Sequence, residues 1–527
     1  MFRIFIIFTL SLLVLITVLT SDIFSITPQQ FDPKQLLFIM ASLSAFLLLV
    51  VSGLRRRRTY AVYILFLFFP FLSQSAYYLN ISSPFFIITP VFLYLVTALI
   101  FTKNISSPKL LQIVLLFSTS IIISVLIADN INTAFTFYLL GVGGFCITVY
   151  LIYFNVRNSS NPLTFIKGLI LSIVIGTVIY FLIEVITFGL GPQDILNIIG
   201  RKWHLLPSGR YFTGGYKEPA GLAFVYASIF WVIISFYQFG RADRKKNSFS
   251  PIFFALLASL FLLLISGTRN AIINLVTIGI CLWFLRQRLG LAREFKFKFR
   301  YLFALLLLVG VSTYYLLPRT ALSVGSSRRT SFSEPTIIKI GSMEFELVGT
   351  TAMYYKKNEI SFQDFFKNPL GSGPLNATPY KDSPEGGLRN YFSFISNVFV
   401  IGATFGWFSL FLWLTFTIYC GYLVFKLRNF VYDKNLYSIT VVFLSILIAS
   451  LLPGSYYLGP SINWSNFIYD QPLSPELLSV PAEYPAIISG VIIGCLIGLI
   501  EVQRRKIQEL NPPINQALEK NTASFSG

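Results

Sequence analysis

The most regular feature of the chain is a succession of apolar runs of about 20 residues, separated by polar segments that often carry Lys or Arg. A helix needs about that length to cross a bilayer, because backbone groups in lipid must hydrogen-bond within their own segment. The pattern predicts an all-α, polytopic integral membrane protein with about 14 transmembrane helices. The expected spans are 2–20, 36–53, 59–79, 84–102, 110–127, 134–156, 165–187, 219–239, 251–267, 270–286, 301–317, 400–425, 437–453 and 486–502.

Long polar interruptions between these runs predict how the chain is organised. Two of them, 188–218 and 318–390, are expected to be large loops outside the cytoplasm, and such loops between membrane helices are more often functional than idle. We therefore divide the chain into N-terminal helices 1–187, a core 188–425 that contains both loops, C-terminal helices 426–502 and a cytoplasmic tail 503–527.

The charge balance refines the topology and removes one class of function. A net charge of +19 could indicate nucleic-acid binding, but only 12% of the residues are charged and 55% are hydrophobic. When the helices are threaded alternately, the basic clusters fall on one side, which is the positive-inside pattern. We therefore expect both termini in the cytoplasm and no nucleic-acid partner. The single histidine and four cysteines within apolar runs predict no metal site and no cofactor.

The first external loop carries groups suited to an anion. Arg210 could bind phosphate oxygens through its planar guanidinium, and neighbouring glycines would let backbone N–H groups approach closely. The alternative is an aromatic interfacial loop whose cations meet lipid head groups. The candidate substrate-binding residues here are Arg201, Lys202, Tyr211, Gly214, Gly215, Tyr216 and Lys217, with His204 and Glu218 as candidate bases.

Two features within the apolar runs carry charge. Arg269 follows Ser266-Gly-Thr at the hinge between two long spans, where the helix dipole disfavours a cation unless an anion is near. The alternative is an arginine whose head reaches out of the membrane to the interface. Glu184 near the outer end of span 165–187 is either functional or part of a structural ion pair.

The second external loop ends in a glycine-rich turn, Asn368-Pro-Leu-Gly371-Ser-Gly373, and Arg389-Asn390 then precedes the next span. Glycine-rich turns are common, so this signal has low specificity by itself. We include Gly371, Gly373 and Asn390 among the candidate substrate-binding residues and Arg389 among the catalytic ones.

Together these motifs resemble the bacterial O-antigen polymerase and O-antigen ligase superfamily over roughly residues 200–425. Arg210–Gly221 is similar to the family's arginine motif, and Ser266-Gly-Thr-Arg269 to the hinge that opens the shared domain. The turn at Gly371 resembles the Pro-Leu-x-Gly-x-Gly segment late in the large periplasmic loop. Gly402-Ala-Thr-Phe-Gly406 is similar to the glycine-rich start of the following helix.

The resemblance implies a GT-C-like glycosyltransferase of the bacterial inner membrane that uses a polyprenyl-diphosphate-linked glycan donor and a lipid-linked acceptor. Arg210, Arg269 and Arg389 would hold the diphosphate, and a chain-length regulator is a further partner for such an enzyme. Ligases of the superfamily have a histidine where this chain has Arg389-Asn390, which favours a polymerase in lipopolysaccharide-type polysaccharide biosynthesis. The alternatives are a ligase-type glycosyltransferase and a flippase or transporter for lipid-linked oligosaccharide.

Overall fold

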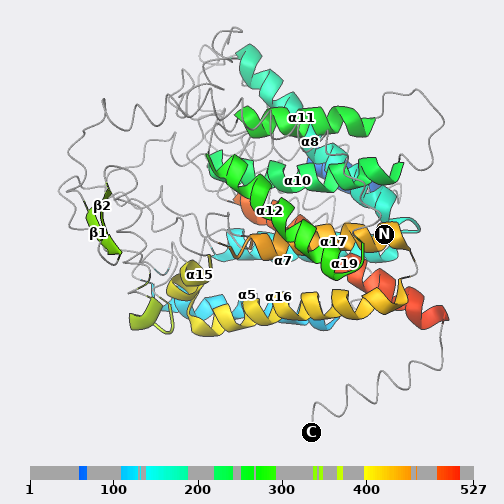
Figure 1. Cartoon of the computed structure of the whole chain (residues 1–527). Coiled ribbons are helices and arrows are strands. Elements are labelled where there is room, and N and C mark those ends of the chain that lie inside the picture. Colours follow the sequence, from blue (N-terminus) through cyan, green and yellow to red (C-terminus); the bar gives the residue numbers. More distant parts are fainter. Residues whose placement is uncertain are drawn as a thin grey trace, which may run out of the picture.

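The protein is a bundle of long helices running side by side (Figure 1). Among the described residues, four helical segments are long and apolar enough to cross a membrane: Lys109–Leu126, Pro162–Leu182, Trp407–Phe430 and Ile487–Glu509. These helices agree with the prediction of a helical membrane protein, whereas the full set of spans extends over residues outside the described ones. The computed structural model describes residues 59–67, 108–128, 131, 138–187, 219–240, 251–265, 269–291, 336–340, 343–347, 362, 365–371, 397–431, 433–452, 458–459 and 483–510.

Most expected spans in this part of the chain are helices with bounds close to those predicted. Proline stands at the first position of several, where its missing N–H costs nothing and its fixed φ favours the helix. Asp433 caps another by accepting hydrogen bonds from the backbone N–H groups of Asn435 and Leu436. The helices are α5 Lys109–Leu126, α7 Gly144–Asn158 after the π-helical turn η3 Tyr138–Gly143, α8 Pro162–Thr187, α10 Pro219–Gly240, α11 Pro251–Ile265, α12 Arg269–Arg288, α17 Lys434–Ala449 and α19 Glu483–Leu510.

One expected span needs correction. The span 400–425 is two helices, α15 Asn397–Phe405 and α16 Trp407–Leu427, which are separated at Gly406. Gly406 has a φ of 88° and a ψ of 164°, a backbone conformation that only glycine adopts readily. Apolar residues continue across the break, so hydropathy alone could not reveal it. Because α16 has 21 residues, it is long enough to cross a membrane without α15.

The segment 318–390, which the sequence predicts to be external, contains a β-hairpin that the all-α prediction did not include. Strand β1, Thr336–Ile340, pairs antiparallel with β2, Met343–Leu347, and Ile338 stands opposite Phe345. By the alternation of strands, apolar residues and one threonine share one face, while Lys339, Glu344 and Glu346 occur on the other.

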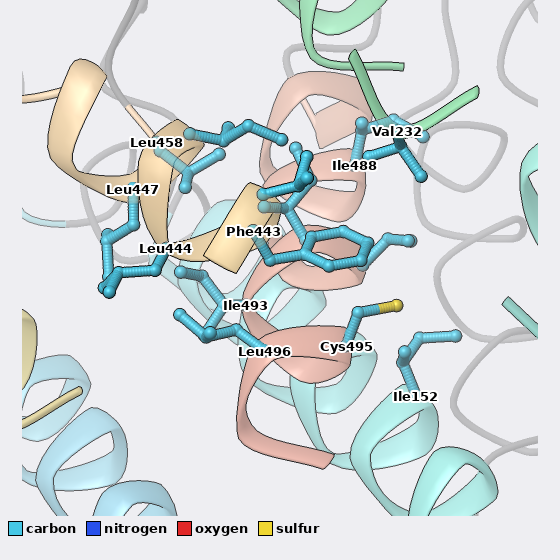
Figure 2. Packing of buried hydrophobic residues seen from close by; sticks show 14 of the residues in the cluster. Ile152, Val232, Phe443, Leu444, Leu447, Leu458, Ile488, Ile493, Cys495 and Leu496 are labelled. Atoms are coloured by element: carbon cyan, nitrogen blue, oxygen red, sulfur yellow. The ribbon is translucent and has the colours of Figure 1, made fainter. Parts of the chain in front are cut away.

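The centre of the bundle is built around a close helix pair. Gly490, Gly494 and Gly498 of α19 recur every four residues and face α7, where a Cβ on Gly494 would lie 2.8 Å from the Ile152 Cβ. Such spacing lets two helix backbones approach closely, the arrangement that favours association in membranes. Helix α17 also packs on α19. Figure 2 shows side chains of α7, α10, α17 and α19 meeting around Phe443.

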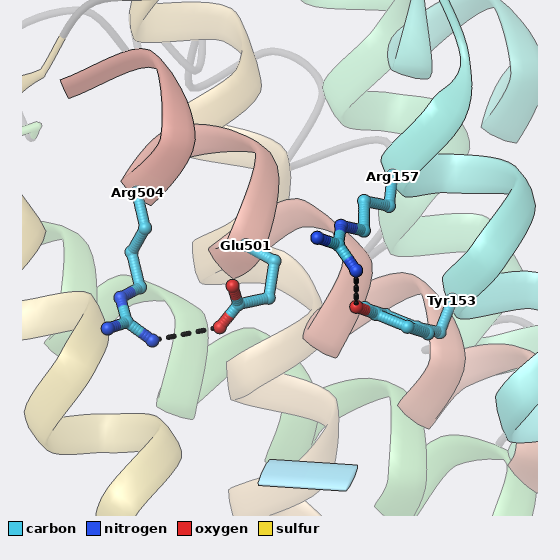
Figure 3. A network of polar contacts seen from close by, with 4 residues as sticks. All are labelled: Tyr153, Arg157, Glu501 and Arg504. Carbon is cyan, nitrogen blue, oxygen red and sulfur yellow. Dashed lines mark hydrogen bonds and ion pairs between the residues drawn. The ribbon is translucent and has the colours of Figure 1, made fainter. Parts of the chain in front are cut away.

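Basic residues gather where several helices end together. Arg428 beyond α16 donates to the Arg288 backbone oxygen at the end of α12, with 3.0 Å between nitrogen and oxygen. Arg157 near the end of α7 donates to the Tyr153 hydroxyl at 2.8 Å, and Arg504 of α19 forms an ion pair with Glu501 at 2.9 Å (Figure 3). We call this the basic end of the bundle, and the opposite end the far end.

Candidate functional site

The most structured part of the candidate site is a junction between residues 365–371 of the segment 318–390 and the break before α16. The Gly371 N–H donates to the Asn368 carbonyl at 2.9 Å, which closes a turn whose last residue has a φ of 86°. The Trp407 N–H then donates to the Pro369 carbonyl at 2.8 Å. This bond satisfies one of the backbone donors that the first turn of α16 cannot pair internally. We call residues 365–371 and 402–407 the glycine junction.

Each of its two central glycines is required by the other segment. A Cβ on Gly371 would lie 2.5 Å from the Thr404 carbonyl oxygen and 2.6 Å from the Gly406 nitrogen. A Cβ on Gly406 would lie 2.6 Å from the Leu370 carbonyl oxygen. Both positions also have positive φ, which penalises any side chain. Two motifs that the sequence analysis treated separately therefore form one backbone-to-backbone contact.

Aromatic side chains hold the junction closed. The Phe365 ring lies directly against Gly402 of α15. The Trp407 indole N–H donates to the Phe365 carbonyl at 2.7 Å, and the two rings lie 5.5 Å apart between centroids. The glycine junction is thus fixed by one side-chain and one main-chain hydrogen bond from the same tryptophan.

Helix α5 supports the junction from the side. The hydroxyls of Ser120 and Ser409 lie 2.7 Å apart within a hydrogen bond, and both residues are buried. One turn further along α16, Trp413 packs against Phe117 with 4.7 Å between ring centroids. These contacts keep the start of α16 in place against the bundle.

The glycine junction lies at the far end of the bundle, together with the first residues of α10 and α12. Trp231 of α10 donates to the Leu275 carbonyl of α12 at 2.9 Å, and Ser235 further along α10 accepts from Arg286 further along α12. The two helices therefore run in the same direction. Because α16 ends beside the end of α12, the N-terminal ends of α10, α12 and α16 share the far end.

Helix α12 begins at Arg269, at the hinge where the sequence predicts it. By helical periodicity, position 269 falls on the same face as Ile273, Val276 and Ile280, which are exposed. Arg269 thus stands on the exposed side of the helix start, a position compatible both with an anionic ligand and with the interfacial alternative. The Arg269 side chain itself lies outside the described atoms.

The opposite face of α12 holds a buried polar group. The Asn274 side chain is fully buried, and neither its amide nitrogen nor its oxygen has a hydrogen-bond partner in the described structure. Near the basic end, the Arg286 guanidinium is also buried and donates to the Ser235 and Ser438 hydroxyls at 3.3 and 3.4 Å. Arg286 stands at the end of the expected span 270–286, a place in the sequence that gives no sign of burial.

The remaining predicted residues have mixed outcomes. Gly371 is placed and buried in the junction, and Glu184 lies on α8, although its side chain is not described. Contact of Gly371 with substrate stays a prediction. The following predicted site residues lie outside the described residues: Arg201, Lys202, His204, Arg210, Tyr211, Gly214, Gly215, Tyr216, Lys217, Glu218, Gly373, Arg389 and Asn390.

Chain connectivity still limits where several of these residues can be. Glu218 directly precedes Pro219, the first residue of α10. Asn390 stands seven residues before Asn397, where α15 begins, so a fully extended chain keeps it within roughly 25 Å of that helix. Helix α10 begins at the far end of the bundle, and α15 ends there in the glycine junction.

The described residues hold no group of three or more His, Cys, Asp or Glu side chains that could bind a metal ion. No protein-family model, no curated protein and no solved structure matches the chain.

Proposed function

We propose that this protein is a membrane-embedded glycosyltransferase that polymerises a surface polysaccharide from polyprenyl-diphosphate-linked repeat units at the outer face of the cytoplasmic membrane. The observation that carries the proposal is the glycine junction. Two segments that resemble separate motifs of the O-antigen polymerase and ligase superfamily, about 30 residues apart, depend on each other for their backbone conformation.

The chemistry requires cations but no nucleotide pocket. The bond between the donor's anomeric carbon and its diphosphate breaks, and a new bond forms from that carbon to a hydroxyl oxygen of the acceptor. The hydroxyl proton passes to a base, and polyprenyl diphosphate leaves with the bonding electrons. Arginines aimed at the developing negative charge typically lower such a barrier by about 3–4 kcal/mol each.

The candidate arginines are compatible with one site. Arg269 begins α12, the loop that carries Arg210 leads into α10, and the loop that carries Arg389 leads into α15. Helices α10 and α12 begin at the far end of the bundle, and α15 ends there in the glycine junction, which supports a common diphosphate site. Glu218 and His204 are the candidate acceptor bases, and a chain-length regulator is a proposed partner.

A lipid-linked oligosaccharide flippase is the second candidate. The observation that favours it is Arg286, a buried cation between α10, α12 and α17. A transport pathway needs polar groups through the depth of the membrane, whereas an enzyme needs them together at one surface. Arg286 lies at the basic end, whereas Arg269 begins the same helix at the far end, so the polymerase remains our first proposal. A ligase-type transferase uses the same donor and differs in its acceptor.

Single substitutions in cells test the proposal. Arg210→Ala and Arg269→Ala should each reduce long-chain polysaccharide by about 10²–10³-fold in rate while lipid-linked single repeats still reach the outer face. Arg288→Ala is the matched control, because Arg288 is an exposed arginine at the other end of α12. Normal chain length in both far-end variants would refute the arginine site. Repeats that accumulate on the cytoplasmic face would indicate the flippase instead.

A further inference from the structure

A second feature of the far end is an exposed apolar surface beside the glycine junction. Its six large side chains are between 42% and 64% exposed, although they come from two segments that are held together. Exposed apolar surface of this extent is unusual in contact with water and marks a binding surface for protein or lipid. We call it the apolar patch, and it consists of Phe362, Phe366, Leu370, Trp407, Phe408 and Phe411.

The loop segment presents its apolar residues in two opposite directions. Phe365 packs inward on Gly402, whereas Phe362, Phe366 and Leu370 are exposed and recur every four residues. The Phe362 and Phe366 rings lie edge to face at 5.0 Å, so the exposed row is itself ordered. This spacing is typical of an amphipathic segment with one face available to a partner.

The apolar patch continues the exposed face of α16 without interruption. Phe411, Ile418 and Phe425 share one side of that helix by periodicity, and all three are exposed. Because α16 is long and apolar enough to cross a membrane, this side is its lipid-facing stripe. The patch therefore begins where a lipid-facing surface reaches the far end of the bundle.

The surrounding residues fit a membrane interface. Trp407 is amphipathic, and tryptophan is enriched where hydrocarbon meets head groups. Lys367 and Asn368 are exposed directly after Phe366, and a lysine there can keep its ammonium group among the phosphates while its stem lies along apolar surface. This arrangement favours the bilayer over a protein as the partner.

We propose that the turn segment 365–371, together with Phe362, is an interfacial anchor that inserts the exposed row of the apolar patch into the outer leaflet of the bilayer. The anchor holds the glycine junction at the depth of the lipid head groups. This inference does not depend on the proposed function, because a flippase or a ligase would have the same anchor.

Spin labels on the full-length protein in phospholipid vesicles test the anchor. We would introduce Phe366→Cys and Leu370→Cys one at a time, with Ile418→Cys as the lipid-facing reference and Lys367→Cys as the reference on the polar face of the turn. The unsubstituted chain gives the background from its four cysteines, which lie within helices. All substituted positions are exposed or half-exposed, so the bundle should tolerate the changes.

The measured quantity is the ratio of label relaxation by molecular oxygen, which partitions into lipid, to relaxation by a water-soluble nickel chelate. We expect the ratio for labels at 366 and 370 to be several-fold higher than the ratio for a label at 367. It should approach the ratio measured at the lipid-facing position 418. A ratio at 366 equal to that at 367 would overturn the proposal. A label shielded from both reagents would also overturn it, because the patch would then be covered by protein.

Discussion

Replacing Gly406 with alanine should open the glycine junction without removing any polar group. Gly406 separates α15 from α16 with a φ of 88° and a ψ of 164°. A Cβ there would approach the Leu370 carbonyl oxygen to 2.6 Å and the Pro369 carbonyl oxygen to 3.0 Å. Both contacts involve backbone atoms, which cannot rotate away as the end of a side chain can.

The magnitude follows from two terms. Holding a non-glycine residue in this backbone region costs about 1–3 kcal/mol. Crowding a closely packed contact costs about 1–3 kcal/mol more. The loop can relieve both by undocking, which breaks the hydrogen bond from Trp407 N–H to the Pro369 carbonyl. We therefore expect the free energy of opening at this bond to fall by about 2 kcal/mol or more, which makes exchange about 30-fold faster.

Hydrogen exchange of the Trp407 amide in detergent-solubilised protein measures this opening. Gly421→Ala is the matched control, because Gly421 lies in the middle of α16 and a Cβ there would meet nothing within 4 Å. That variant should leave exchange at Trp407 unchanged and stabilise the helix by up to about 1 kcal/mol. Gly371→Ala combined with Gly406→Ala should cost little more than either change alone, since both open the same contact. Equal exchange in Gly406→Ala and Gly421→Ala would refute the reasoning.

Further predictions concern helix packing in the bundle and the contact between Trp407 and Phe365 in the glycine junction. Gly494→Leu should lower the free energy of unfolding by about 1–3 kcal/mol, because its Cβ would lie 2.8 Å from the Ile152 Cβ. Thermal unfolding in detergent measures this loss, with Gly421→Leu as the control because a Cβ at Gly421 meets nothing within 4 Å. Thr440→Val removes the buried hydrogen bond from the Gln503 amide at 2.7 Å and should cost roughly 0.6–1.7 kcal/mol; an unchanged unfolding midpoint would contradict this. Trp407→Phe keeps an aromatic ring but loses the hydrogen bond from the indole N–H to the Phe365 carbonyl, so protease cleavage after Lys367 should become faster. Trp413→Phe is the comparison variant and should leave the rate of this cleavage unchanged.

Hydrophobic runs were sufficient to predict most helices in the described residues. Span 110–127 is α5, Lys109–Leu126, and span 251–267 is α11, Pro251–Ile265. These predictions hold because a membrane helix must satisfy its backbone hydrogen bonds within its own segment, so length and apolar composition nearly determine it. The prediction of one continuous span at 400–425 was wrong, because the break at Gly406 is stabilised by its contact with the segment around Gly371, about 35 positions earlier.

Two further features of the structure have recognisable signals in the sequence. The alternating runs at 336–340 and 343–347 flank a Gly-Ser pair, which is typical of a tight hairpin. Gly490, Gly494 and Gly498 recur every four residues, which predicts close packing of a membrane helix. Neither pattern by itself identifies the segment that it contacts. The pairing of α19 with α7 follows only from three-dimensional packing.

The candidate site was less predictable than the helices. Arg269 begins α12 as expected, whereas Arg210 and Arg389 lie outside the described residues, so the proposed convergence of the three arginines stays a prediction. Loop conformation is set by contacts between distant segments, as the glycine junction illustrates. The burial of Arg286 likewise depends on Ser235 and Ser438 from two other helices, which no local pattern could reveal.

The most direct test of the central claim uses purified protein in vesicles supplied with a polyprenyl-diphosphate-linked repeat unit on the side where the far end of the bundle emerges. The proposed function predicts a ladder of longer lipid-linked glycans and one released polyprenyl diphosphate for each bond formed. Arg288→Ala should preserve this ladder, and Arg269→Ala should abolish it. Repeat units that cross the bilayer without any elongation would contradict the proposal and identify the protein as a transporter.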